Sequence, residues 1–442
     1  MASPTQPSFR RRSARARLAL AAGATAAWAS RTAGRGAGAT LPGLVGLRVD
    51  PGLLSTLAAG RTIAVVSATN GKTTTARMLA AAVGTSGPVL SNTQGSNLER
   101  GVLTSLMTDR RGATARCVFE VDELALAAVA RQVRPRVFVL GNLSRDQLDR
   151  MIEVRVVAGR WRAVLAEARD QAARDGAPAP VVVANADDPM VASAVLGDDN
   201  APVLPVVWVG VAQPWTADAA SCPRCARPWS FDADYRCEHC GFSRPTADWR
   251  LDGTDLVGAA GLRRPLELTL PGRANRANAV MAVAAAAQLG VDVDAALAAI
   301  RPLGDVAGRY AVAQVDGVQL RLLLAKNPAG WQEMLDQAAE EAGSATPRPV
   351  VLALNAQGAD GKDTSWIWDV PFEKLRGRPV LVAGERAEDL AVRLRYAEIS
   401  FSLNPDPIAA VTELAGQTGA GHIDLLANYT AFTGALHRLG VS

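Results

Sequence analysis

Four of the five cysteines in this 442-residue chain lie in one short stretch, CPRCARPWSFDADYRCEHC, as Cys222, Cys225, Cys237 and Cys240. Two thiolates that are two residues apart can reach one ion from a tight turn, and two such turns complete a tetrahedron. The doubled C-x-x-C spacing therefore predicts a structural Zn²⁺ site without an open position for catalysis. A redox dithiol or unpaired thiols are the alternatives. The fifth cysteine, Cys117, lies in an apolar stretch, which favours a small buried side chain.

A second stretch, IAVVSATNGKTTTARML at residues 63–79, has the residue types that bind phosphate. Gly71 would let backbone N–H groups approach an anion, Lys72 would add a positive charge, and the Thr73 hydroxyl would suit Mg²⁺. The common phosphate loop has a further glycine, G-x-x-x-x-G-K-[ST], where this chain has Val66. The pattern predicts a site for a nucleoside triphosphate. The alternative is a polar turn with an incidental lysine.

The elements around these residues indicate α/β architecture. Apolar strands are predicted at 62–68, 115–123, 135–144 and 179–189, with helices at 72–87, 123–133 and 160–176 between them. This alternation is typical of a doubly wound parallel sheet. The pattern stops near Trp208, a cysteine-bearing insert runs to about Trp249, and a strand and an alanine-rich helix follow. Later strands at 318–325, 348–355, 379–385 and 422–428, with helices at 330–343 and 387–397, predict a second, Rossmann-like α/β domain.

We therefore expect three regions: a basic helical segment at 1–42, a central ATP-binding domain at 43–300 with the insert at about 212–250, and a C-terminal domain at 301–442. The chain is 49% hydrophobic and 20% charged, and its net charge of +4 does not by itself indicate nucleic-acid binding. No stretch is apolar enough to predict a spanning helix. The alanine-rich composition and the predicted nucleotide site favour the reducing cytoplasm, where clustered cysteines bind a metal more often than they form disulfides.

The first forty residues carry seven arginines and no acidic residue. An export signal is disfavoured because Arg15 and Arg17 interrupt the apolar run and no clear cleavage site follows. Two readings stay open. One is a basic amphipathic helix that touches an anionic membrane surface, on the inner face, or a partner. The other is a helix that packs on the protein body with its arginines in water.

The phosphate-binding segment resembles the ATP loop of the Mur ligase family, whose T-x-G-K-[TS]-T pattern falls on Thr69, Asn70, Gly71, Lys72, Thr73 and Thr74. These ligases use ATP to phosphorylate a carboxylate, and an amine then displaces the phosphate. The resemblance implies that Thr73 and Glu120, at the end of the strand CVFE, bind Mg²⁺. It also implies ATP contacts from Asn275 and Asn278 in PGRANRANAVMAVAA and from Arg309 in GDVAGRY. Without the resemblance, the two asparagines would be interpreted as helix caps.

Further segments are similar to one branch of these ligases, the MurT family. They are the cysteine insert, NLSRDQLDR at 142–150, LAKNPAGW at 324–331 and ADGKDTSWIWD at 359–369. MurT proteins are the ligase subunits of lipid II isoglutaminyl synthase and act with a GatD-type glutaminase. The resemblance covers nearly the whole chain and implies amidation of the D-glutamate α-carboxylate of lipid II, with ammonia from glutamine.

The same resemblance implies roles for two residues of the second domain. Asp363, the second aspartate of D-G-x-D, would complete the catalytic Cys–His pair of the glutaminase as a catalytic acid supplied in trans. Asp360 and Asp369 are the neighbouring aspartates that could be confused with Asp363. The alternative role for Asp363 is that of a loop aspartate that accepts backbone hydrogen bonds. Lys326 would approach the γ-phosphate of ATP, with an ordinary strand-end lysine as the alternative. Trp366 and Trp368 are expected to be packing or interface residues.

The sequence departs from the family at three places: Ser144 replaces an aromatic residue, MIEVRVVAGR replaces Y-G-E-x-D at 151–160, and no acid follows Arg309. Substrate contacts near 151–157 are therefore in question. Two other functions were weighed. A ligase that adds an amino acid, as muramyl-peptide or folylpolyglutamate ligases do, has no role for D-G-K-D-T-S-W. A nucleotide-switched protein whose zinc ribbon binds nucleic acid would need basic residues beside the cysteines, whereas the insert mixes arginines with acids.

Overall fold

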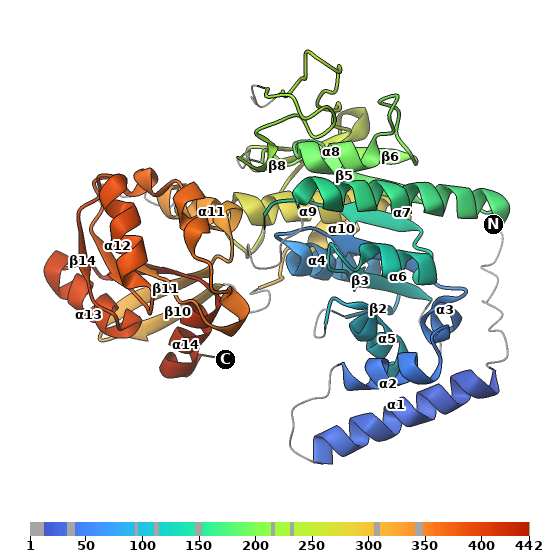
Figure 1. Ribbon diagram of the computed structural model, residues 1–442, viewed down its shortest axis with the longest axis horizontal. Coiled ribbons are helices and arrows are strands. Elements are labelled where there is room, and N and C mark those ends of the chain that lie inside the picture. Colours follow the sequence, from blue (N-terminus) through green and yellow to red (C-terminus); the bar gives the residue numbers. More distant parts are fainter. Residues whose placement is uncertain are drawn as a thin grey trace. The chain divides into compact units, whose positions relative to one another are not determined.

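The computed structural model describes residues 13–32, 40–92, 96–109, 115–145, 153–213, 217–229, 234–304, 310–340 and 348–441. The chain forms two compact units (Figure 1). The first comprises Met1–Leu143 and Val154–Leu303, and the second comprises Ser144–Glu153 and Gly304–Ser442.

The first unit is built on a sheet to which nine strands of the described residues contribute, in the order β2-β3-β1-β4-β5-β6-β7-β8-β9. Neighbouring strands from β2 to β7 are parallel, and the β7–β8 and β8–β9 pairs are antiparallel. The strands are β1 (Thr62–Ser67), β2 (Val89–Ser91), β3 (Arg116–Glu120), β4 (Val137–Leu140), β5 (Val181–Asn185), β6 (Val206–Gly210), β7 (Trp249–Asp252), β8 (Asp255–Val257) and β9 (Arg263–Pro265).

Helices cover this sheet and extend from it. They are α1 (Ala14–Thr32), α2 (Leu41–Val49), α3 (Leu53–Ala58), α4 (Lys72–Gly84), α5 (Glu99–Thr108), α6 (Leu126–Val133), α7 (Val154–Arg174), α8 (Pro189–Val195), α9 (Arg273–Gln288) and α10 (Val293–Ile300). Helix α4 packs against α9 and α10, and α6 packs against α7. Helix α4 connects β1 to β2, at one edge of the sheet, and α6 connects β3 to β4, in the direction of the other edge. Right-handed crossovers therefore put these two helices on opposite faces.

The strands form because their residues are apolar on both faces, as parallel strands between two helix layers require. All residues of β4 are buried, as are Ile63 to Ser67 of β1. The doubly wound parallel sheet predicted from the sequence is confirmed. The sequence analysis did not predict β6, which runs through Trp208 and pairs with β5, and the alternation ends with this strand at Gly210. After the insert, β7 rejoins the sheet beside β6. The residues predicted to bind phosphate follow β1, beside the point where the strand order reverses, which is where such sheets bind ligands.

The second unit has its own sheet. Its described strands are β10 (Tyr310–Val315), β11 (Val318–Leu324), β12 (Val350–Ala353), β13 (Val380–Ala383), β14 (Phe401–Leu403) and β15 (His422–Ala427), in the order β10-β11-β15-β12-β13-β14. Only the β10–β11 pair among them is antiparallel. The helices are α11 (Pro328–Glu340), α12 (Ala387–Tyr396), α13 (Pro407–Thr418) and α14 (Tyr429–Leu439), with short 3₁₀ turns at η4 (Gly358–Asp360), η5 (Ser365–Asp369) and η6 (Phe372–Leu375).

Side chains of the central strands alternate between two cores, one on each face of this second sheet. Leu352 and Val382 point into the core that holds Trp331 and Phe372. Val351 and Leu381 point into the core that holds Phe432. This alternation explains why the strands read as unbroken apolar runs. The predicted strands at 318–325, 348–355, 379–385 and 422–428 are confirmed. In neither unit do the described residues include a helix long and apolar enough to span a membrane.

Candidate functional site

The turn between β1 and α4 has the backbone that a phosphate site needs. Gly71 has a φ of 78°, in the left-handed region, and precedes the first residue of α4. A Cβ atom at this position would lie 2.6 Å from Oδ1 of Asn278 on α9. The positive φ therefore favours glycine at position 71, and a larger residue would also have to displace the Asn278 side chain. The turn leaves the first N–H groups of α4 available to an anion.

Lys72, the first residue of α4, is buried and held by oxygen atoms. Its Nζ lies 2.8 Å from Oε2 of Glu123 and 3.2 Å from the Thr69 carbonyl oxygen, and it also donates to the carbonyl of Ala68. The Lys72 and Glu123 side chains are only 10% and 12% exposed. Glu123 is therefore the counter-ion of the phosphate-turn lysine, a role that the sequence analysis did not assign to it.

Asn142 fixes the phosphate turn from the carboxyl end of β4. Its side-chain oxygen accepts the Asn70 N–H at 2.9 Å, and its side-chain amide donates to the Asn70 carbonyl at 2.9 Å. Its own carbonyl accepts the Thr69 N–H, also at 2.9 Å. Three hydrogen bonds therefore lock two residues of the turn. Sequence reasoning did not select Asn142, although it opens the quoted segment NLSRDQLDR and follows a buried strand.

Glu120 ends β3, the strand that pairs with β1, and is 8% exposed. Asn92 fixes its backbone, accepting the Glu120 N–H and donating to the Glu120 carbonyl, both at 2.8 Å. Within the described part of the chain, the one side-chain donor to this carboxylate is Asn97, at a long 3.5 Å. Carboxylate and hydroxyl oxygens are the donors that Mg²⁺ prefers. Glu120 and Thr73 therefore fit a Mg²⁺ site by the chemistry of their donors and by their positions after neighbouring parallel strands.

Two of the further residues predicted to contact ATP, Asn275 and Asn278, lie on helix α9. Asn275 Nδ2 donates to the Pro271 carbonyl at 2.6 Å, in the first turn of α9. Asn278 lies against Gly71, so it is beside the phosphate turn. The structure carries no nucleotide contact for either residue, and both assignments stay predictions. Arg309 lies outside the described residues.

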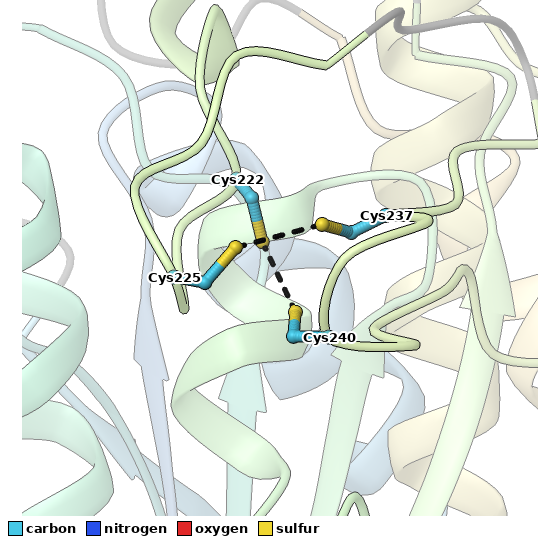
Figure 2. A group of neighbouring side chains, drawn as sticks. All are labelled: Cys222, Cys225, Cys237 and Cys240. Carbon is cyan, nitrogen blue, oxygen red and sulfur yellow. Dashed lines mark hydrogen bonds between the residues drawn. The ribbon is translucent and has the colours of Figure 1, made fainter.

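The four predicted cysteines converge (Figure 2). Their sulfur atoms all lie within 4.8 Å of one another, with 3.6 Å between Cys222 and Cys240 and between Cys225 and Cys237. A tetrahedral Zn²⁺ with Zn–S bonds of about 2.3 Å requires S···S distances of about 3.8 Å. The cluster therefore fits a four-thiolate zinc ion.

The two C-x-x-C turns have the same backbone form. The Ala226 N–H donates to the Cys222 carbonyl at 3.0 Å, and the Gly241 N–H donates to the Cys237 carbonyl at 2.9 Å. The residue after each second cysteine has a positive φ, 63° at Ala226 and 74° at Gly241. An alanine held in this region indicates that the site imposes the turn on the chain. The cysteine side chains are therefore oriented by backbone hydrogen bonds of the two turns.

The insert is fastened to the body of the first unit. Trp229, Tyr235 and Phe242 form a small aromatic core, with ring centroids 5.6–6.0 Å apart. The Tyr235 hydroxyl donates to the Ala186 carbonyl just after β5, at 2.9 Å. Arg244 forms a 2.7 Å ion pair with Asp187 in the same loop. The arrangement supports a structural role for the metal ion.

In the second unit, Lys326 follows β11 and its Nζ lies 5.2 Å from the centre of the Tyr429 ring. The neighbouring Asn327 is buried, and its Oδ1 accepts the Gly330 N–H at 2.9 Å, near the start of α11. Lys326 is thus at the carboxyl edge of the second sheet. Its proposed approach to the γ-phosphate of ATP stays a prediction.

The structure separates the three aspartates that the sequence could confuse. Asp360 is buried and accepts the N–H groups of Tyr429 and Thr430 at 2.9 and 3.0 Å, so it fixes the start of α14. Asp369 forms a 3.2 Å ion pair with Arg145. Asp363 is exposed, and its carboxylate accepts the Ser365 N–H at 2.8 Å. This bond lowers the pKa of Asp363 below its ordinary value.

Two exposed aromatic residues lie close to the Asp363 loop. Trp368 and Tyr396 are 50% and 74% exposed, and their ring centroids lie 5.2 Å apart in an edge-on arrangement. Trp366, by contrast, is buried beside Trp331. The Thr364 hydroxyl donates to Asp389 of α12 at 3.2 Å, which ties the loop to the helix that carries Tyr396. Of the two tryptophans, Trp366 has a packing role and Trp368 is available to a partner.

A phosphate turn of this form on a doubly wound sheet, followed by a second α/β unit, defines the fold of the Mur ligases. The Mur ligase middle domain matches at residues 66–219, and the MurT ligase C-terminal domain matches at 324–432. A relative from Streptococcus pneumoniae, named lipid II isoglutaminyl synthase (glutamine-hydrolyzing) subunit MurT, is 30% identical over 90% of this chain and 91% of its own. A relative of the same name from Staphylococcus aureus is 27% identical over 94% and 95%. The chain belongs to the MurT family.

Solved structures agree at the level of the fold. A pseudomurein peptide ligase type C from Methanothermus fervidus superposes with a TM-score of 0.64 at 18% identity, covering 85% of this chain and 78% of that one. Folylpolyglutamate synthase from Mycobacterium tuberculosis, crystallised with ADP and AMPPCP, gives 0.60 at 16% identity, covering 88% and 93%.

Proposed function

We propose that this protein is the ligase subunit of a glutamine-dependent enzyme that amidates the D-glutamate α-carboxylate of the lipid II stem peptide, in peptidoglycan synthesis. The observation that carries the proposal is the similarity to MurT subunits along almost the whole chain, at 30% identity over 90% of its residues. The phosphate turn adds support, because its residues and conformation suit a triphosphate.

The proposed chemistry has two steps. A carboxylate oxygen of the substrate attacks the γ-phosphorus of ATP, and ADP leaves with the electrons of the broken P–O bond. Ammonia then attacks the carbon of the acyl phosphate and loses a proton, and phosphate leaves with the bridging oxygen. The enzyme must align the two reactants and stabilise charge on the transferred phosphoryl group.

Residues of the first unit would perform these tasks. The N–H groups after Gly71 and the ammonium of Lys72 would bind the phosphates, and Asn142 keeps the turn in position. Thr73 and Glu120 would hold a Mg²⁺ ion that screens phosphate charge. Lys72 would exchange its contact with Glu123 for one with phosphate. The other proposed ATP contacts are Thr69, Asn70, Thr74, Asn275 and Asn278 and, from the second unit, Arg309 and Lys326.

The partner would be a glutaminase of the GatD type. A Cys–His glutaminase needs a third group to orient its histidine, and Asp363 would supply that carboxylate. Its exposure supports this role, as does the neighbouring pair of Trp368 and Tyr396, because exposed aromatic residues are typical anchors of protein interfaces. Asp360 and Asp369 are already engaged in structural contacts within the second unit.

We also propose that Zn²⁺ holds the insert together and takes no part in the reaction, since four thiolates leave no coordination position open. The division into a basic segment at 1–42, a central domain at 43–300 and a C-terminal domain at 301–442 is part of the same proposal. The enzyme would act in the cytoplasm, at the membrane face where its lipid-linked substrate is presented.

An amidation assay tests this function. The chain is purified with its glutaminase partner and incubated with lipid II, ATP, Mg²⁺ and glutamine, and the lipid is analysed by mass spectrometry. We expect conversion of one carboxylate to an amide, dependent on ATP and on glutamine or ammonia. Incorporation of an added free amino acid would assign the chain to peptide-forming ligases. Nucleic-acid binding without amidation would contradict the proposal altogether.

A further inference from the structure

The outward face of α1 differs from that of an ordinary surface helix. Arg17, Ala21, Ala24, Trp28 and Arg31 recur at helical spacing and are all exposed. Leu18 and Trp28 are each 62% exposed. A helix at a protein surface normally carries charged or polar residues on its outward side. Here two large apolar side chains lie on that side, with an arginine near each end.

The orientation of α1 is fixed by its inward face. Ala16, Ala19 and Gly23 are buried, and α1 packs on α2, which packs in turn on α5 (Figure 1). A Cβ atom at Gly23 would collide with the Met107 side chain and lie 3.0 Å from the Pro42 carbonyl oxygen. The Arg15 guanidinium donates to the Val49 carbonyl at 2.7 Å. These contacts prevent α1 from turning Trp28 and Leu18 inward.

Charge on this part of the chain has one sign. Residues 1–49 contain eight arginines and no aspartate or glutamate. Among the described residues, neither Arg17 nor Arg31 has a carboxylate partner. Several other exposed arginines of the first unit do have a carboxylate partner, as Arg131 with Glu167 and Arg134 with Asp175 show. The cations of α1 are thus not neutralised within the described structure.

We propose that the outward face of α1 binds an anionic lipid membrane, with Trp28 and Leu18 entering the headgroup region and Arg17 and Arg31 contacting lipid phosphates. Interfacial helices bind membranes through buried apolar area and through attraction to anionic lipid. Here Trp28 and Leu18 provide the apolar area, and two arginines without a carboxylate partner among the described residues provide the attraction. An acidic protein surface would match the arginines but would leave the apolar pair unexplained. The membrane contact would keep the ATP-binding site close to a lipid-linked substrate. Only this purpose rests on the proposed function.

Vesicle sedimentation tests the inference with the full chain bound to its glutaminase partner. The vesicles contain phosphatidylcholine alone, or equal parts of phosphatidylcholine and phosphatidylglycerol. We expect binding only to the second kind, and weaker binding at high salt. The double variant Arg17→Gln, Arg31→Gln should bind about 25-fold less tightly, because each arginine near an anionic surface contributes roughly fivefold. Trp28→Ala should weaken binding with little change in the salt dependence, since it removes only the apolar part.

The matched control is Arg169→Gln, Arg174→Gln, which removes the same charge from exposed positions of α7. It should bind anionic vesicles like the wild type. Unchanged melting temperature and ATP binding verify that each variant is folded. Equal binding by the α1 variant and the wild type would overturn the inference, as would an equal loss in the α7 control. Loss of the glutaminase subunit from the α1 variant, with vesicle binding intact, would identify the face as a protein interface instead.

Sedimentation needs neither ATP turnover nor lipid II. Absence of vesicle binding would therefore not contradict the proposed amidation. Absence of amidation in a detergent assay would not contradict the membrane contact.

Discussion

Lys72 Nζ lies 2.8 Å from a carboxylate oxygen of Glu123, and both side chains are almost fully buried. The pair joins the phosphate turn after β1 to the loop after β3. It holds the cation of the proposed nucleotide site in place while no phosphate is bound. Removal of the carboxylate would leave a buried ammonium whose remaining contacts are backbone carbonyl oxygens, and an uncompensated buried charge is costly.

We therefore predict that Glu123→Gln lowers the free energy of unfolding of the nucleotide-free protein by about 2 kcal/mol. A non-hydrolysable ATP analogue should recover much of this loss, because its phosphates supply the missing negative charge. Chemical denaturation with and without the analogue measures both effects. Glu167→Gln is the control, since its pair with Arg131 is about half exposed and should contribute little. Equal losses in the two variants would refute the assigned role of Glu123.

Asn142 gives a second prediction about the phosphate turn. Asn142→Ala removes both side-chain hydrogen bonds to Asn70, each worth about 1 kcal/mol, so the affinity for ATP should fall at least about tenfold. Asn142→Asp keeps the acceptor for the Asn70 N–H but places a carboxylate oxygen against the Asn70 carbonyl and a negative charge beside the phosphates, so it should not restore the affinity. Calorimetric titration with the ATP analogue measures the affinity.

A matched control is Asn404→Ala in the second unit. Asn404 also makes two side-chain hydrogen bonds, to Glu413 and to the Asp406 N–H, at 2.8 and 3.1 Å. ATP affinity should not change in this variant. If Asn142→Ala binds ATP as the wild type does, the turn does not depend on Asn142.

Strand β1, the turn after it and the cysteine cluster could be predicted from the sequence, because the patterns that indicate them lie within short segments. Residues 62–67 form a buried strand since nearly every side chain is apolar, and a glycine and lysine follow where the chain must turn into α4. The cysteine spacing likewise predicts the cluster from a tight turn. Glu123 and Asn142 could not be assigned in the same way. Each acts on the phosphate turn from a different strand end, 51 and 72 residues away in the chain.

The outward face of α1 is another feature that sequence left open. The composition of the first forty residues was compatible with a membrane contact and with a helix packed on the protein body. The structure shows that only one side of α1 packs on the body. Small residues, Ala16, Ala19 and Gly23, face inward. In a helix that is apolar on both sides, periodicity alone does not decide which side is buried.

A third prediction concerns the three aspartates of the second unit. In the complex with the glutaminase, Asp363→Asn should abolish glutamine hydrolysis while ATP binding is unchanged. Asp369→Asn, at a neighbouring exposed position, should retain hydrolysis. Asp360→Asn should instead destabilise the second unit, because Asp360 accepts two N–H groups at the start of α14. Glutamate release measures the first effect. Normal hydrolysis by Asp363→Asn would remove this residue from the glutaminase site.

The pKa of Asp363 adds a pH dependence. The hydrogen bond from Ser365 lowers this pKa below the ordinary value of 3.8, so the carboxylate stays ionised down to lower pH. Protonation of Asp363 therefore cannot produce an acid limb between pH 5 and 7 in glutamine hydrolysis, where histidine titrates. A limb in that range should persist in the residual activity of Asp363→Glu, with its midpoint following the pKa of the histidine. Disappearance of the limb in this variant would contradict the prediction.

The fourth prediction separates the cysteines by reactivity. The folded chain should contain one Zn²⁺, and its four ligand thiols should resist iodoacetamide at pH 8 until a chelator removes the ion. Burial raises the pKa of Cys117 to about 11, so at pH 8 only about one thiol in a thousand is ionised and reactive. Cys117 should therefore react only after denaturation. Mass spectrometry counts the modified thiols, and rapid labelling of all four ligands before chelation would argue against a zinc site.

The central claim is that a substrate carboxylate is activated by ATP at the turn around Gly71. Lipid II carrying oxygen-18 in the D-glutamate α-carboxylate tests it directly, with the phosphate and the lipid analysed after one round of ATP- and glutamine-dependent reaction. The account predicts oxygen-18 in inorganic phosphate, one labelled oxygen for each amide formed, and no transfer in Lys72→Ala. Amide formation accompanied by unlabelled phosphate, or labelled phosphate from Lys72→Ala at the normal rate, would contradict it.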